Sequence, residues 1–165
     1  MDTRWTELLE TLRQLLGYYR ALLEINQNKQ QVLIKVDSKA LEKLTQQEEI
    51  IIVKMGKVEE LRRKAVDDLA DFYGVPKSQM DLSELRRHAE GTTLEELSEI
   101  TAAFEAVWAE LMPLNEANAK LIQQALGIIQ YNLNLLSNNS VGHTYADRGT
   151  DAGPVRKSIM LDAKA

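Results

Sequence analysis

Residues 94–136 read LEELSEITAAFEAVWAELMPLNEANAKLIQQALGIIQYNLNLL, and an apolar residue returns at every seventh position within them. As a single helix this stretch would extend about 64 Å at 1.5 Å per residue. A compact domain of this chain length has a radius of gyration of only about 15 Å. The pattern therefore predicts a rod of long helices that displays side chains along its length. The seventh-position residues are Ile100, Val107, Leu114, Leu121, Ile128 and Leu135.

The composition of the 165-residue chain disfavours several classes of protein. A net charge of −5 argues against a nucleic-acid surface, which needs a concentrated basic face. The absence of cysteine excludes a disulfide framework and a thiolate metal site. The N-terminus lacks the apolar run of a secretory signal, and the densest aliphatic run, residues 50–53, is far too short to span a bilayer. We therefore expect a cytoplasmic protein without membrane insertion.

Start and stop signals divide the first half of the chain into two helices. Apolar residues spaced by three and four predict a helix over about residues 3–35. Asp37 or Ser38 then caps a second helix. This helix ends where Gly74 accepts positive φ and Pro76 cannot continue the hydrogen-bond ladder. The short connection between the two helices implies an antiparallel pair.

A short helix is predicted next, over about residues 82–89, followed by a third long helix. Thr93 and Glu96 match a capping box at the start of that helix. Pro113 is expected to bend or briefly interrupt it, with a kink of more than about 20°. The turn-rich sequence after Leu136 predicts the end of the helix.

Together these signals predict an all-α fold. It is an elongated antiparallel bundle of three long helices, with one short helix between the second and the third. Residues 1–136 form the helical domain. Residues 137–165 have little periodicity and several Gly, Ser and Asp residues, so they are expected to form a mobile C-terminal tail.

The sequence offers no support for catalysis. The histidines are His88, in the short charged helix, and His143, in the tail. Glu84 lies four residues before His88, which is not the Glu-x-x-His spacing of di-iron bundles. Glycine-rich phosphate loops and hydrolase nucleophile elbows are absent. We therefore predict no catalytic residues, no metal and no cofactor.

One segment is more apolar than bundle packing requires. On a helical wheel at 100° per residue, the apolar residues between 121 and 136 cover an arc of about 180°, and Tyr131 extends it. A helix that buries one face in a bundle needs a stripe only a little over about 100° wide. The surplus is buried in the monomer, or it meets a second copy or a partner, and we favour a partner.

Two amides lie where this stripe would otherwise be apolar. Asn115 and Asn118 need hydrogen-bond partners if they are buried. They satisfy backbone groups freed by Pro113, or they specify the register of the helix, as single polar residues do in coiled coils. The sequence leaves both interpretations open.

The order of motifs along the chain resembles that of the flagellar export chaperones of the FlgN family. The stretch 114–122, LNEANAKLI, is similar to the Leu-Asn-x-x-Asn-x-x-Leu-Ile segment of that family. The stretch 145–149, YADRG, matches its Tyr-x-x-x-Gly element. The N-terminal leucine-rich helix and ALEKLT at residues 40–45 are similar too. This chain has Ala119 directly after the second Asn of the segment, in place of the small residue, often glycine, that is common there in the family.

This resemblance implies a cytoplasmic, non-enzymatic chaperone for type III flagellar export. Its clients would be hook-associated proteins of the hook–filament junction, bound through their terminal helical regions and delivered to the export gate. The alternative is a structural coiled-coil protein that self-associates through the same stripe, for example as a homodimer. The predicted partner-binding residues are Asn115, Asn118, Leu121, Ile122, Ala125, Leu126, Ile129, Leu133, Leu136 and Tyr145.

Overall fold

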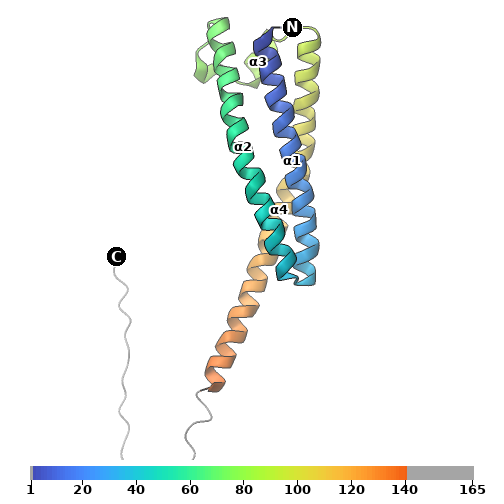
Figure 1. Ribbon diagram of the computed structural model, residues 1–165, viewed down its shortest axis with the longest axis vertical. Helices are drawn as coiled ribbons and strands as arrows, with labels where there is room; N and C mark the ends of the chain where they lie inside the picture. The colour runs from blue at the N-terminus through green and yellow to red at the C-terminus, as the bar shows by residue number, and fades with distance from the viewer. Residues whose placement is uncertain (1, 141–165) are drawn as a thin grey trace, which may run out of the picture. The chain divides into compact units, whose positions relative to one another are not determined.

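A computed structural model describes residues 2–140 of the chain, and these residues form helices without any strand (Figure 1). The predicted all-α fold class is therefore confirmed. The chain consists of two compact units. The first ends at Leu126, and the second begins at Gly127. Within the described range, no helix is long and apolar enough to cross a membrane. The helices in order are α1 (Thr3–Lys35), α2 (Ser38–Tyr73), the 3-10 helix η1 (Lys77–Gln79), α3 (Leu82–His88) and α4 (Thr92–Ser140).

The turn between α1 and α2 follows its predicted chemistry. Asp37 is the N-cap of α2, and its side chain accepts a hydrogen bond from the N–H of Ala40 at 3.0 Å. That bond satisfies one of the four N–H groups that a helix start leaves open. Val36 closes α1 in the left-handed conformation with φ 56°. The connection is therefore as short as the sequence predicts.

The end of α2 is set by Gly74, which has φ 68° and whose N–H donates to the carbonyl of Ala70. A side chain at this φ is strained, because its Cβ approaches the following carbonyl oxygen. Gly56 lies inside the same helix with ordinary dihedral angles, and a Cβ there would meet open space. The two glycines of α2 therefore have opposite effects on stability.

We predict that Gly74→Ala lowers the free energy of unfolding by about 1–2 kcal/mol. Gly56→Ala should raise it by up to about 1 kcal/mol, because alanine is the better residue inside a helix. Urea denaturation followed by circular dichroism measures both changes. The same sign for the two variants would contradict the assigned backbone conformations.

The start and the end of α4 differ from the prediction. The helix begins at Thr92, so Thr93 lies in the first turn and not at the N-cap. The N–H of Thr93 donates to the carbonyl of Glu90, and the carboxylate of Glu96 forms an ion pair with Arg13. The predicted capping box is therefore wrong, because a tertiary ion pair takes its carboxylate.

The helix α4 continues through Pro113 and ends at Ser140, four residues beyond the predicted end at Leu136. Pro113 therefore does not interrupt the helix, and the angle of the bend that we expect there stays a prediction. The domain boundary at residue 136 also stays a prediction.

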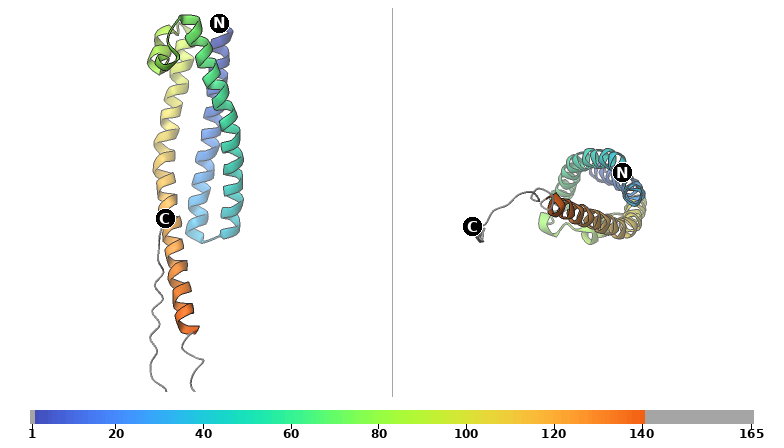
Figure 2. Two further views of the ribbon diagram at one scale, coloured as in Figure 1. Left: turned by 90° about the vertical axis from the view of Figure 1, so that its left-hand side faces the viewer. Right: turned by 90° about the horizontal axis from the view of Figure 1, so that it is seen from below.

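In the first unit, α1, α2 and the first part of α4 lie side by side (Figures 1 and 2). Pairs between α1 and α2 run in opposite directions, since Trp5 meets Tyr73 and Lys29 meets Glu48. Pairs between α1 and α4 advance together, so these helices are parallel. They join Arg13 to Glu96, Tyr19 to Phe104, and Asn26 to Asn118.

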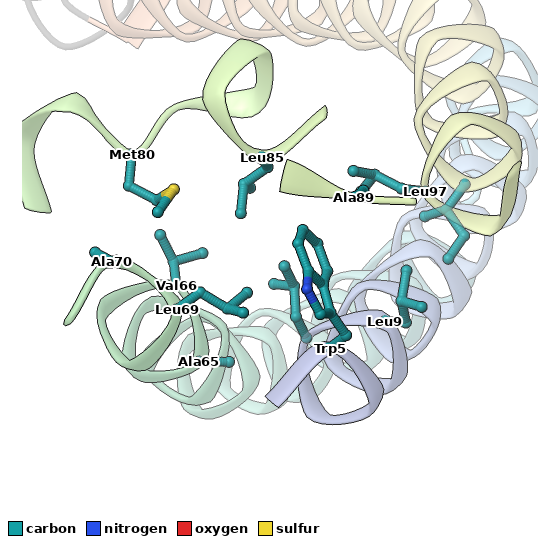
Figure 3. Packing of buried hydrophobic residues seen from close by; sticks show 12 residues of the cluster. Trp5, Leu9, Ala65, Val66, Leu69, Ala70, Met80, Leu85, Ala89 and Leu97 are labelled. Carbon is teal, nitrogen blue, oxygen red and sulfur yellow. The ribbon is translucent and has the colours of Figure 1, made fainter. Parts of the chain in front are cut away.

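A cluster of buried apolar residues lies at the end of the first unit where α3 packs against the long helices (Figure 3), and further buried apolar residues follow along α1 and α4. Trp5 of α1 is 4% exposed and donates from Nε1 to the hydroxyl of Tyr73 at 3.0 Å. Leu69 of α2 and Leu97 of α4 are fully buried beside it. Leu85 brings α3 into the same cluster. The short helix therefore closes this end of the bundle.

Candidate functional site

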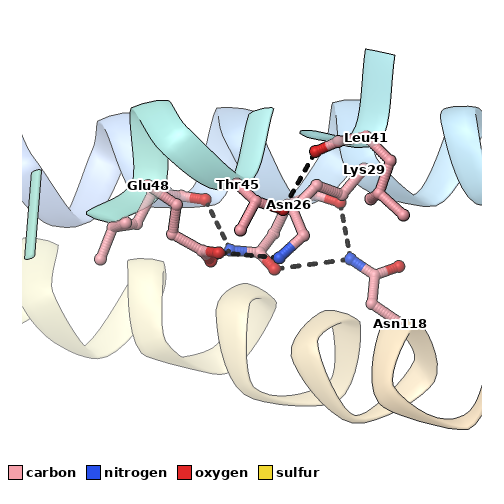
Figure 4. Close-up of polar contacts among 7 residues, drawn as sticks. Asn26, Lys29, Leu41, Thr45, Glu48 and Asn118 are labelled. Atoms are coloured by element: carbon pink, nitrogen blue, oxygen red, sulfur yellow. Dashed lines mark hydrogen bonds and ion pairs between the residues drawn. The ribbon is translucent and has the colours of Figure 1, made fainter. Parts of the chain in front are cut away.

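A buried polar cluster joins α1, α2 and α4 around Asn118, which is 2% exposed (Figure 4). The Nδ2 of Asn118 donates to the backbone carbonyl of Asn26 at 2.8 Å, with the Oδ1 of Asn26 at 3.4 Å. Asn26 in turn donates to Glu48 at 3.3 Å. Lys29 forms an ion pair with Glu48 at 2.7 Å. These contacts fix one position of α4 along α1.

The hydrogen bonds of Asn118 distinguish between the two interpretations of Asn115 and Asn118, which are satisfying backbone groups freed by Pro113 and specifying the helix register. Its donor reaches a residue of another helix and not a carbonyl near Pro113, which favours the register interpretation for Asn118. Its Oδ1 is buried and has no partner in the described part of the chain. Asn115 is exposed, so its amide does not need a hydrogen-bond partner within the chain.

Beside this cluster lies a groove of about 810 Å³ within the first unit. Tyr19 of α1 and Trp108 of α4 form one wall, with ring centroids 5.2 Å apart. Ile52 of α2 and Met112 of α4 continue the apolar lining. Glu48 and Glu116 supply acidic side chains. The groove is therefore apolar at its aromatic wall and acidic in places.

The pKa values of three residues near the groove are shifted, and two of these residues, Glu59 and Arg62, form an ion pair. Burial is the main cause that raises the pKa of Tyr19, and the nearby Glu59 raises it further while Arg62 opposes. A hydrogen bond from Arg62 is the main cause that lowers the pKa of Glu59. The same hydrogen bond raises the pKa of Arg62. The pKa shifts of Glu59 and Arg62 therefore follow from their pairing, whereas that of Tyr19 follows mainly from burial.

The predicted apolar site residues of α4 in the first unit differ in exposure. Leu121 and Ile122 are half-buried, Ala125 is exposed, and Leu126 is 59% exposed. They therefore offer apolar surface that the described chain leaves at least partly open.

In the second unit, every predicted site residue that the structure describes is exposed. Ile129 and Leu133 are each 55% exposed, and Leu136 is 67% exposed. The neighbouring Ile128 and Tyr131 are 62% and 63% exposed. Within residues 2–140 the wide apolar arc is thus not buried. Tyr145 lies outside the described residues.

The exposed positions share a spacing that the sequence analysis traced only in part. Alternating steps of four and three run along α4 from Trp108, which is 41% exposed, through Met112, which is 60% exposed, to Leu136. The predicted apolar stripe omits Trp108 and Met112 because it begins at Leu121, after Pro113. Alternating steps of three and four, counted backward from Leu136, reach both. We call this row the α4 seam; it comprises Trp108, Met112, Asn115, Ala119, Ile122, Leu126, Ile129, Leu133 and Leu136.

The histidine of α3 has a structural role. The ring of His88 stacks on Tyr73 with centroids 4.2 Å apart, and its Nε2 lies 3.1 Å from the carboxylate of Glu84. His143 lies outside the described residues. Across residues 2–140, no group of three or more His, Cys, Asp or Glu side chains is placed to hold a metal ion.

Comparison with known protein families matches residues 1–153 to the family described as FlgN protein. The chain belongs to the FlgN family. FlgN-family proteins are flagellar export chaperones that bind flagellar proteins for export, and this is the role that the family gives the chain. Separate searches of curated proteins and of solved structures find no match. The matched residues include the α4 seam and Tyr145.

Proposed function

We propose that this FlgN-family chain is a cytoplasmic chaperone that binds hook-associated proteins of the hook–filament junction and delivers them to the flagellar export gate. The observation that carries the proposal is the α4 seam, whose apolar side chains are regularly spaced and, apart from the half-buried Ile122, exposed. A client helix with anchors spaced by three and four would fit such a row. The terminal helical region of a hook-associated protein is the client segment that we propose.

The size of the apolar surface is consistent with holding a client. Burying an aliphatic side chain contributes about 1.5–3 kcal/mol, so a few anchors are enough for a specific complex after the ordering costs. Leu126, Ile129, Leu133 and Leu136 of the seam are each at least 55% exposed. Asn118 is buried against α1, so we assign it to holding α4 in register and not to contact with the client.

The proposal predicts that Ile122→Asp, Ile129→Asp and Leu136→Asp each weaken client binding by at least about 100-fold. Each change places a charge in a desolvated contact, which costs several kcal/mol. The measurement is the affinity of the full chain for synthetic peptides covering the terminal helical regions of the hook-associated proteins. Gln124→Asp is the matched control, because Gln124 is exposed on the same helix but lies off the seam. Circular dichroism checks that each variant is folded.

Two further results belong to the same test. Tyr145→Ala should weaken client binding or delivery while changing stability by less than about 0.5 kcal/mol. If the chain instead pairs with itself through the seam, its mass in sedimentation rises with concentration and the Asp variants remain monomeric. Normal client binding by all folded Asp variants would overturn the proposed site.

A further inference from the structure

Two hollows of the first unit lie along the same three long helices. The larger is the groove of about 810 Å³ with the wall of Tyr19 and Trp108, which we call the Trp108 groove. The smaller, of about 300 Å³, lies nearer to α3. The residues that line either hollow are Leu8, Leu12, Tyr19, Leu22 and Asn26 of α1, and Glu48, Ile52, Arg62 and Val66 of α2. On a helical wheel at 100° per residue those of α1 fall within about 80°, and so do those of α2. The same faces of these helices therefore line both hollows.

A helix already packs against these faces at the smaller hollow. Leu82 and Leu85 of α3 line it, together with Met80 just before that helix. Figure 3 shows Leu85 pointing into the apolar cluster with Val66 and Leu69. The Trp108 groove, in contrast, is lined by α1, α2 and α4 alone among the described residues. The position that α3 fills at one end of the unit is therefore open farther along.

The apolar side chains of the Trp108 groove remain accessible. Ile52 of α2 is 54% exposed, and Trp108 and Met112 of α4 are exposed as well. Exposed apolar surface that gathers in a groove is typical of a site that binds another chain. The groove is also continuous with the α4 seam, because it is lined by four members of the seam, namely Trp108, Met112, Asn115 and Ala119.

The charged side chains of the groove have partners within the chain. Glu48 pairs with Lys29 at 2.7 Å, and Glu116 pairs with Lys120 at 2.9 Å. Neither carboxylate therefore requires a charged ligand. The apolar walls determine which ligand fits, and that ligand is an apolar helix face of the kind that α3 presents to the same helices.

We propose that a client helix lies in the Trp108 groove as a fourth helix, packed against α1, α2 and α4. This inference rests on the proposed function and extends the client contact from α4 to Tyr19 of α1 and Ile52 of α2. From Trp108 to Ala119 the groove is about 16 Å long at 1.5 Å per residue, or about three helical turns. The client segment that fits is therefore a helix of about three turns with apolar anchors spaced by three and four.

The first measurement is the affinity of the full chain for the client peptides that test the proposed function. Ile52→Asp should weaken binding at least about tenfold, because it places a charge in a desolvated contact. Val53→Asp is the matched control, since Val53 is the next residue of α2 and is 63% exposed but does not line the groove. It should change binding less than about twofold, as at a surface position away from the site. Circular dichroism checks that both variants are folded.

The second measurement follows Trp108 directly. The chain has two tryptophans, and Trp5 is buried, so quenching of fluorescence by acrylamide reports mainly on Trp108. A saturating client peptide, with any tryptophan replaced by phenylalanine, should shield Trp108 from acrylamide. Trp108→Phe should abolish this change, because only the buried Trp5 then remains.

The outcomes separate this inference from the proposed function. A loss with Ile52→Asp no greater than with Val53→Asp, while Ile129→Asp still weakens binding, would overturn the groove and leave the proposed function standing. Failure of the wild-type chain to bind any of the peptides would overturn both. Shielding of Trp108 in the dilute free chain, or shielding that grows with chain concentration before peptide is added, would place the chain itself or a second copy in the groove and overturn the inference.

Discussion

Leu69→Ala is expected to lower the free energy of unfolding by about 2–5 kcal/mol. Leu69 is fully buried on α2 and belongs to the cluster that contains Trp5, Met80 and Leu97. Removing its side chain loses apolar burial and leaves a cavity between helices that cannot close completely. Urea denaturation followed by circular dichroism measures the loss.

Leu61→Ala is the control for this variant, because Leu61 is on the same helix and is 55% exposed. It should change stability by no more than about 0.5 kcal/mol. A similar loss for both variants would mean that helix propensity, and not the core of Figure 3, determines the stability of the first unit.

Asn118→Asp is expected to lower the free energy of unfolding by about 3 kcal/mol or more at pH 7. The substitution replaces the Nδ2 donor with an oxygen, which would then face the backbone carbonyl and the Oδ1 of Asn26. A buried charge without donors is strongly destabilising. Asn118→Leu removes the orphaned Oδ1 but also leaves the buried Oδ1 of Asn26 without its donor, so it should cost about 1–3 kcal/mol, less than the Asp variant.

The pH dependence of Asn118→Asp has a definite sign. Burial without donors should raise the pKa of the new carboxyl in the folded chain above its unfolded value of about 4. The folded state then binds more protons than the unfolded state, so the loss of stability relative to the wild-type chain shrinks as the pH falls from 7 toward 4. A loss that is independent of pH would show that residue 118 is accessible to water.

The helix boundaries were predictable because they depend on local chemistry. Asp37 and Gly74 lie where the sequence signals place them, since a cap or a left-handed turn needs only neighbouring backbone groups. The predicted capping box is wrong because the partner of its carboxylate is distant in the sequence. Glu96 was assigned to its own helix start, but a distant residue, Arg13, takes its carboxylate. No local pattern contains that contact.

The candidate site was predictable only in part. Periodicity identified the apolar surplus after Leu121, because arc width is a property of one helix. It could not decide which interpretation of Asn118 holds, because that depends on α1 lying parallel to α4 with Asn26 opposite. It also missed Trp108, whose exposure depends on how the neighbouring helices pack.

Hydrogen exchange of the full chain with and without the terminal helical peptide of a hook-associated protein tests the central claim most directly. The account predicts slower exchange of the backbone amides over residues 121–136 in the complex. Protection over residues 39–64 with none over residues 121–136 would contradict it, because the client would then bind α2 and not the α4 seam.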